Sequence, residues 1–181
     1  MSFFEQGSPA QTNPYLTFGK TPAGFWRRVL ATLIDGLVVA ILSALIAKLI
    51  SPSISLTNIT AGAALYKSEI LYTTIQLVIS VSYQIILVGH APGRTIGDYA
   101  AGIQVVSLEM GVPGYTRASK RVTIALVSSA LSYTVVSPLG SLLFLIDGLW
   151  MLFDKNRQTI HDKIAGTYVI RYLRNGAVTN L

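Results

Sequence analysis

Three long apolar runs constrain the fold of this chain more than any other feature of its sequence. They cover residues 25–50, 70–88 and 122–153 and contain few charged side chains. The first two are each about as long as the ~20 residues with which an α-helix crosses a bilayer. Only 12% of the 181 residues are charged, against roughly 25% in a soluble globular domain. The sequence therefore predicts an all-α membrane protein.

The third run is too long for one ordinary span. Ser137-Pro138-Leu139-Gly140 lies within it and has the composition of a turn. We expect this turn to divide the run into two helices of about 15 residues each, short enough to form a shallow hairpin or to thin the bilayer locally. With the first two runs they would form a four-helix transmembrane bundle of two helical hairpins.

Basic residues indicate on which side of the membrane the loops lie. They cluster before the first run, between the second and third runs and after the last, whereas Lys48 and Lys67 lie toward the other side. Because basic loops stay in the cytoplasm, the number of crossings must be even. We expect a multi-pass protein of the cell inner membrane with both termini cytoplasmic. The net charge of +6 is explained by this orientation, so no nucleic-acid partner is expected.

The two ends of the chain differ from its apolar centre. Residues 1–20 are rich in Ser, Pro, Asn, Gln and Gly, a composition that cannot bury enough apolar surface to fold. We expect a disordered cytoplasmic tail over residues 1–20, a transmembrane domain over 21–174 and a flexible end over 175–181.

A short motif occurs twice, each time after a predicted hairpin. Residues 95–102 read Thr-Ile-Gly-Asp-Tyr-Ala-Ala-Gly, and residues 159–166 read Thr-Ile-His-Asp-Lys-Ile-Ala-Gly. Thr with Asp three residues later matches a capping box, and the final Gly matches a helix stop. We expect two short cytoplasmic interfacial helices, each followed by a β-branched strand, and the two strands can pair. The expected caps are Thr95 with Asp98 and Thr159 with Asp162, and the expected strands are 103–106 and 167–170.

Two aspartates inside the predicted spans are candidates for ion or proton binding. Asp35 lies seven residues after Arg28, about 10 Å into the first helix. Asp147 lies seven residues before Asp154, which gives it the same depth from the same side. A carboxylate at the centre of a membrane helix costs roughly 2.5–3.5 kcal/mol on insertion scales, so partners, water, an ion or a proton must offset that cost. At the same depth, Tyr83 and Ser128 would add oxygen atoms.

Two interpretations of these carboxylates stay open. In one they bind Na⁺ or H⁺, because hard cations prefer oxygen ligands and neighbouring buried carboxylates retain a proton. In the other they only fix helix packing through hydrogen bonds. The same choice, cation path or packing, applies to a polar stripe on the second run, formed by Gln76, Ser80, Tyr83 and Gln84.

The role of Arg28 is likewise open between two interpretations. Its side chain can snorkel and bind lipid phosphate, or it can pair with Asp98 or Asp162 at the interface.

Three segments of the chain carry a family resemblance. Residues 24–35 contain Arg28 and Asp35, residues 93–97 read Gly-Arg-Thr-Ile-Gly, and residues 157–167 contain the second copy of the motif. They resemble the signatures of the RDD family, small membrane proteins named for an arginine and two aspartates. Either Asp147 or Asp162 can be the second of these aspartates. The resemblance implies a polytopic membrane protein, for which transport of unidentified ligands is the usual suggestion and cation/proton antiport is attributed to some members.

Enzyme activity is not expected. The chain has no cysteine and only two histidines, and it lacks a phosphate-binding loop, a nucleophile elbow and a zinc-protease motif. We therefore expect no catalytic residues, no transition-metal site and no cofactor other than bound Na⁺ or H⁺.

The expected function is ion-coupled transport, a sodium or other monovalent cation/proton antiport that uses the intramembrane aspartates. The alternative is a non-transporting scaffold or assembly factor. Expected partners are membrane lipids, the cation and a second copy of the chain, since four short helices make a small transporter. The contacts between copies would use small residues, either Ala40 and Ala44 or Ser128 and Ser132.

Overall fold

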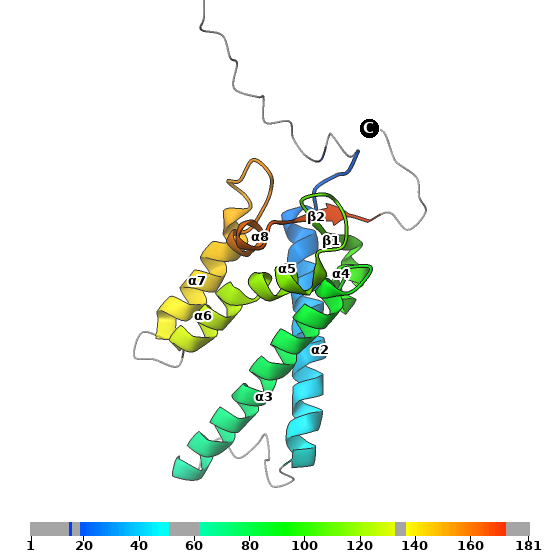
Figure 1. The fold of residues 1–181 in the computed structure, drawn as a ribbon. Coiled ribbons are helices and arrows are strands. Elements are labelled where there is room, and N and C mark those ends of the chain that lie inside the picture. Colours follow the sequence, from blue (N-terminus) through cyan, green and yellow to red (C-terminus); the bar gives the residue numbers. More distant parts are fainter. Residues whose placement is uncertain (1–14, 16–18, 51–61, 133–136, 173–181) are drawn as a thin grey trace, which may run out of the picture.

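The computed structural model describes residue 15 and residues 19–50, 62–132 and 137–172 (Figure 1). Most of the predicted tail, 1–20, and the whole predicted end, 175–181, lie outside these residues. Tyr15, which belongs to the predicted tail, has a defined position in the structure. It is buried, its ring packs edge-on against Tyr168, and its hydroxyl donates to the carbonyl of Asn156 over 2.6 Å.

Two helices are long and apolar enough to cross a membrane. They are α2, Phe25–Ile50, and α3, Gly62–Gly89, of which Leu71–Gly89 is the apolar part. Little of either apolar stretch is covered by other parts of the protein, so the side chains are free to face lipid. The two helices meet near α4 and diverge toward their other ends (Figure 1). The helix α3 begins earlier than predicted, because residues 63–69 include the good helix formers Ala, Leu, Lys and Glu, although their polar members interrupt the apolar run.

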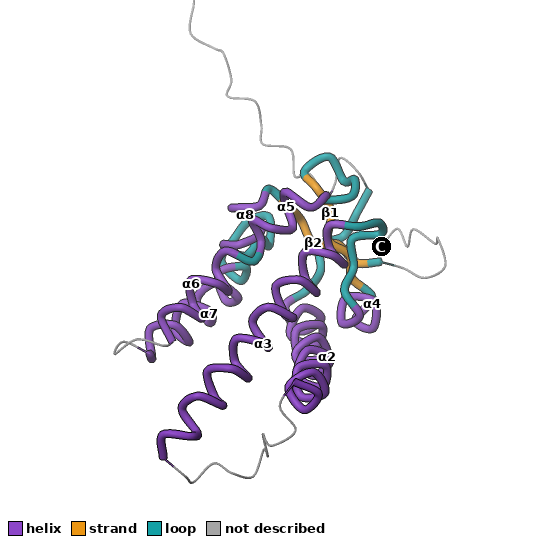
Figure 2. Tube along the Cα trace, turned by 60° about the horizontal axis from the view of Figure 1, so that its bottom comes forward, coloured by secondary structure: helices purple, strands orange, loops and turns teal. Residues whose placement is uncertain are grey.

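The second hairpin is shorter. It consists of α6, Thr123–Ser132, and α7, Ser137–Trp150, which pack on each other. At 1.5 Å per residue they are about 15 and 21 Å long, short of the ~30 Å hydrocarbon core. They stand apart from the α2–α3 pair in both views (Figures 1 and 2). The structure thus supports two candidate spans and does not confirm a four-helix bundle.

The turn predicted at residues 137–140 is wrong. These residues form the first turn of α7, where a proline is tolerated because the first amides of a helix have no partner within it. The connection between the helices falls within residues 133–136, which lie outside the described residues.

Both copies of the repeated motif form the short helices that the sequence predicts. They are α4, Ile96–Ala101, and α8, Ile160–Ala165, and each begins with a complete capping box. Each ends at a glycine with φ near +65°, Gly102 or Gly166. A left-handed backbone of this kind favours glycine because it has no Cβ.

A small antiparallel sheet follows the short helices. Its strands are β1, Ile103–Ser107, and β2, Thr167–Arg171, with Val105 opposite Val169. This confirms the predicted strand pair. The segment before α2 runs along β2 as well, because the Ala23 amide donates to the Val169 carbonyl over 2.9 Å.

One helix was not predicted. The helix α5, Gly114–Arg121, lies in the basic segment between the second and third apolar runs, and it contacts α3 and α8 (Figure 1). Its one buried side chain, Ala118, joins a core that connects the sheet with α2, α3 and α4. The core residues are Ala23, Ala31, Val88, Ala101, Ile103, Val105, Ala118 and Val169.

A Gly97→Ala substitution should destabilise the protein by about 2 kcal/mol, the usual cost of overpacking a tight site. A Cβ at Gly97 would collide with the Ala31 carbonyl and lie 2.7 Å from Cγ of Asp35. Gly36→Ala is the matched control, because a Cβ there meets no atom within 4 Å. Thermal unfolding in detergent measures both variants. Equal melting temperatures would contradict this close packing of α4 on α2.

Candidate functional site

Asp35 holds α4 and α3 to the side of α2. Its side chain is buried and accepts three hydrogen bonds: from the Tyr83 hydroxyl over 2.6 Å, from the Gly97 amide over 2.7 Å and from the Thr95 hydroxyl over 2.7 Å. The Tyr83 hydroxyl in turn accepts from the amide of Ile96 over 3.0 Å. Of the oxygens predicted at this depth, that of Tyr83 therefore reaches Asp35 directly, as a hydrogen-bond donor.

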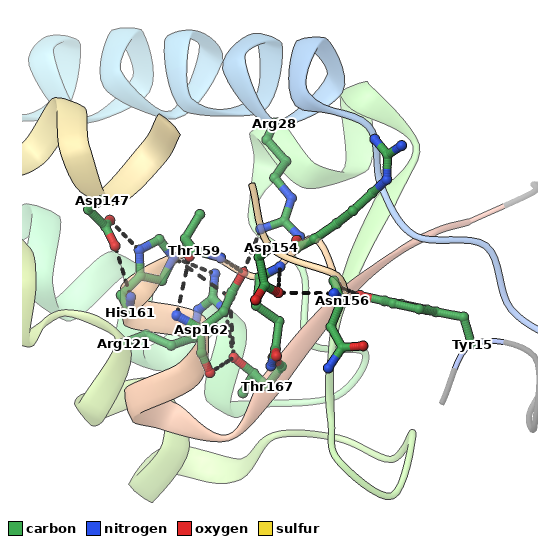
Figure 3. Close-up of polar contacts among 12 residues, drawn as sticks. Tyr15, Arg28, Arg121, Asp147, Asp154, Asn156, Thr159, His161, Asp162 and Thr167 are labelled. Atoms are coloured by element: carbon green, nitrogen blue, oxygen red, sulfur yellow. Dashed lines mark hydrogen bonds and ion pairs between the residues drawn. The ribbon is translucent and has the colours of Figure 1, made fainter. Parts of the chain in front are cut away.

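Asp147 on α7 makes the equivalent contact with the second short helix. It is buried and accepts from the His161 amide over 2.8 Å, and its other oxygen lies 2.6 Å from Nδ1 of His161 (Figure 3). Gly97 and His161 occupy the same place in the repeated motif. Asp35 and Asp147 thus each accept the same backbone amide in one copy of the repeat. The sequence showed the repeat and the two aspartates but gave no signal that they meet.

Asp162 is the most enclosed acidic group of the site. Arg28 on α2 approaches it to 2.5 Å, and Arg121 on α5 binds its other oxygen (Figure 3). Burial alone would raise the pKa of Asp162, but the charges of Arg121 and Arg28 outweigh it and hold the pKa well below the usual range. Asp162 is therefore a carboxylate at neutral pH. Of the partners considered for Arg28, the structure places it against Asp162, with a second bond of 2.8 Å to the Arg157 carbonyl.

Asp98 occupies the same motif position as Asp162 in a different environment. It is buried, accepts from the Thr95 amide over 3.1 Å, and makes no salt bridge with any described residue. Burial raises its pKa, and nearby Asp35 adds to this effect. The sequence interpretation assigned Asp98 and Asp162 the same capping role. Both cap their helices, but only Asp162 is neutralised by arginines.

One cavity connects these groups. Its volume is about 820 Å³, and it lies between the α2–α3 pair and the α6–α7 hairpin. Asp35, Asp98, Asp147 and His161 all contribute to its wall. Of the polar stripe on α3, Gln76, Ser80 and Gln84 line the cavity. Ser128 is buried on α6, and its neighbour Ser129 lines the cavity instead.

His161 lies between two carboxylates. Its Nδ1 faces Asp147, and its Nε2 lies 3.3 Å from Nη2 of Arg121 and 3.7 Å from an oxygen of Asp162. A neutral imidazole that donates from Nδ1 and accepts at Nε2 satisfies both close contacts. The described residues include no group of three or more His, Asp or Glu placed to hold a metal ion.

An Asp162→Asn substitution should destabilise the protein by about 3–5 kcal/mol at neutral pH, because it leaves two partly buried arginines without their counter-charge. Asp98→Asn is the matched control: it keeps a carbonyl acceptor for the cap and removes no salt bridge. Thermal unfolding in detergent compares the two. A similar fall in melting temperature in both variants would contradict the difference in environment between Asp162 and Asp98.

The two aspartates should also affect the pH dependence of stability in opposite directions. The pKa of Asp162 is lowered by folding, so its contribution is present above the unfolded value near 3.8 and is lost as the pH falls below that value. The pKa of Asp98 is raised, so its contribution is present below 3.8 and is lost as the pH rises through the folded pKa. Asp98→Asn should therefore reduce the loss of stability on going from pH 4 toward neutrality. A pH series of melting temperatures that is unchanged by Asp98→Asn would contradict this.

Comparison with known proteins identifies the family. The family model described as the RDD family matches residues 22–166, which include the first helices, both repeats and every site residue named above. Comparison with curated proteins and with solved structures gives no significant match. The match covers most of the chain, and two helices have the length and composition of membrane spans. The chain belongs to the RDD family and is a membrane protein.

Proposed function

We propose that this protein is an ion-coupled transporter that exchanges a monovalent cation, sodium or a similar ion, for protons. The observation that carries the proposal is the cavity between the two hairpins, into which Asp35, Asp98 and Asp147 project from three different helices. Carboxylates gathered in a membrane protein are costly unless something neutralises them. In a transporter that exchanges a cation for protons, these carboxylates would bind the cation or the proton.

The exchange follows from competition for the same negative charge. A buried carboxyl that no basic side chain binds directly retains its proton more readily, and burial raises the pKa of Asp98 although the charge of nearby Arg121 opposes this effect. A cation that enters the cavity favours the ionised form of the acids and so displaces protons. The side-chain oxygens of Gln76, Ser80 and Gln84 supply further hard ligands on the α3 wall. His161, hydrogen-bonded to Asp147, lines the same cavity.

The proposal includes an arrangement in the membrane. The hairpin α6–α7 enters the bilayer beside α2 and α3, and both termini face the cytoplasm of a cell with an inner membrane. Membrane lipids, the cation and a second copy of the chain are the proposed partners, with no enzymatic reaction and no nucleic acid. Ala40 and Ala44 on α2 are partly exposed and suit a contact between copies, whereas Ser128 is buried within its own protomer.

A second function, that of a non-transporting scaffold, is favoured by one observation. Asp35 already accepts three hydrogen bonds from protein groups. A carboxylate satisfied in this way serves to hold helices together and leaves little capacity for a cation. Under this alternative the same would hold for Asp147, and the cavity would have no transport role.

Proton flux in proteoliposomes separates the two functions. With an imposed pH gradient, the wild-type protein should give sodium-dependent proton flux, and Asp98→Asn and Asp147→Asn should each reduce it at least about tenfold, the scale set by losing an essential proton carrier. Asp35→Asn should also abolish flux. Glu109→Gln is the matched control, because it removes one negative charge from an exposed side chain away from the cavity. Absence of wild-type flux, or unchanged flux in Asp98→Asn and Asp147→Asn, would favour the scaffold.

A further inference from the structure

A second pocket lies outside the cavity, at the N-terminal end of α2. It is a shallow recess of about 460 Å³, and three of the residues around it are arginines. They are Arg27, Arg157 and Arg171, which come from α2, from the loop before α8 and from the end of β2. All three are exposed. We call this recess the arginine pocket.

Backbone hydrogen bonds bring these distant positions together. The Arg171 amide donates to the Thr21 carbonyl over 2.8 Å, which places the end of β2 beside the segment that leads into α2. Arg28 donates to the carbonyl of Arg157 over 2.8 Å, which fixes the loop before α8 against the first turn of α2. Arg157 holds a backbone φ of +50° there, a conformation that disfavours a residue with a Cβ. The pocket is therefore part of the folded structure and not a chance grouping of mobile side chains.

Among the described residues, no acidic side chain neutralises the charge of the arginine pocket. No described Asp or Glu forms a salt bridge with any of the three arginines. Arg27 donates from Nη1 to the Ala101 carbonyl over 2.8 Å, and this bond leaves its charge uncompensated. Three guanidinium groups around one recess repel each other unless an anion lies between them. Arginine binds phosphate oxygens in pairs through parallel hydrogen bonds.

The other wall of the arginine pocket is aromatic. Trp26 and Phe25 line it, their rings meet edge-on with centroids 5.3 Å apart, and Trp26 is 79% exposed. Tryptophan at the end of a membrane helix lies at the headgroup level of the bilayer. The helix that begins here, α2, has the length and composition of a span. The pocket therefore faces the depth at which lipid phosphates occur.

We infer that the arginine pocket binds the phosphate of an anionic phospholipid, with its headgroup between Arg27, Arg157 and Arg171 and its acyl chains beside Trp26. A lipid headgroup and a free phosphate both present phosphate oxygens, which the arginines would bind equally well. Only a lipid would also use the exposed aromatic wall. The inference does not depend on transport, because the pocket lies away from the cavity acids and would serve a scaffold as well.

Lipid-dependent stability tests this inference. Detergent-solubilised protein is titrated with phosphatidylglycerol, with zwitterionic phosphatidylcholine, and with soluble glycerol phosphate, and the apparent affinity is taken from the rise in melting temperature. Phosphatidylglycerol should stabilise the wild-type protein, and the other two should not do so at equal concentration. Arg157→Gln and Arg171→Gln should each weaken phosphatidylglycerol binding roughly fivefold, the effect expected for one basic residue at an anionic surface.

Lys155→Gln is the matched control. It removes one positive charge from an exposed side chain in the loop that contains Arg157, and Lys155 is not part of the arginine pocket. Its phosphatidylglycerol affinity should equal that of the wild-type protein. Melting temperatures without lipid provide the baseline for each variant, and native mass spectrometry counts bound lipids independently of stability.

Three results would overturn the inference. One is stabilisation by glycerol phosphate as strong as that by phosphatidylglycerol, which would assign the pocket to a soluble anion. Another is equal binding of phosphatidylcholine. The third is an equal loss of binding in Lys155→Gln and the arginine variants, which would mean that only total charge matters. Failure of proton flux in the transport assay would leave these outcomes unchanged, so the two proposals are tested separately.

Discussion

The structure depends on one buried carboxylate held between two arginines. Asp162 on α8 joins Arg28 at the start of α2 to Arg121 at the end of α5. Removing such a charge from water is expensive, and only close counter-charges with good geometry offset the cost. The need for both arginines fixes the relative positions of α8, α2 and α5. The preceding residue, His161, binds Asp147, so the position of α8 also determines where the α6–α7 hairpin is attached.

The internal repeat shows how one local design can give two electrostatic environments. Both copies begin with the same capping box and end with the same left-handed glycine. In both, an aspartate from a preceding apolar helix accepts the second amide of the short helix, Asp35 in one copy and Asp147 in the other. The copies differ in their neighbours. Asp162 has two arginines, whereas Asp98 faces the cavity with a raised pKa.

The features that were predictable from the sequence are those fixed by nearby residues. The spans at α2 and α3 follow from apolar composition, and α4 and α8 follow from a threonine and an aspartate three residues apart. The strands follow from β-branched runs after a glycine stop. Such signals depend on local chemistry within one or two turns. The four-helix bundle was an inference from total apolar length, and the lengths of α6 and α7 do not establish it.

The features that sequence reasoning missed depend on contacts between distant positions. The Gly97 amide and Asp35 are separated by 62 residues, and nothing in either segment indicates the other. The helix α5 is polar and is held mainly by its contacts with α3 and α8, so a search for apolar periodicity does not find it. The arginine pocket draws on three separate segments for the same reason. Tertiary contacts of this kind require the fold before they can be seen.

Gly97 and His161 occupy the same place in the two copies of the repeat, and the difference between them changes what joins each short helix to its aspartate. At Gly97 the backbone of α4 touches α2 with no room for a side chain, and both helices share one apolar core with the sheet. At His161 the backbone amide binds Asp147 in the same way, and the imidazole ring adds a second contact to the same carboxylate. The attachment of α8 to α7 therefore depends on a polar side chain in addition to the backbone, whereas α4 meets α2 through backbone atoms that leave no space for one.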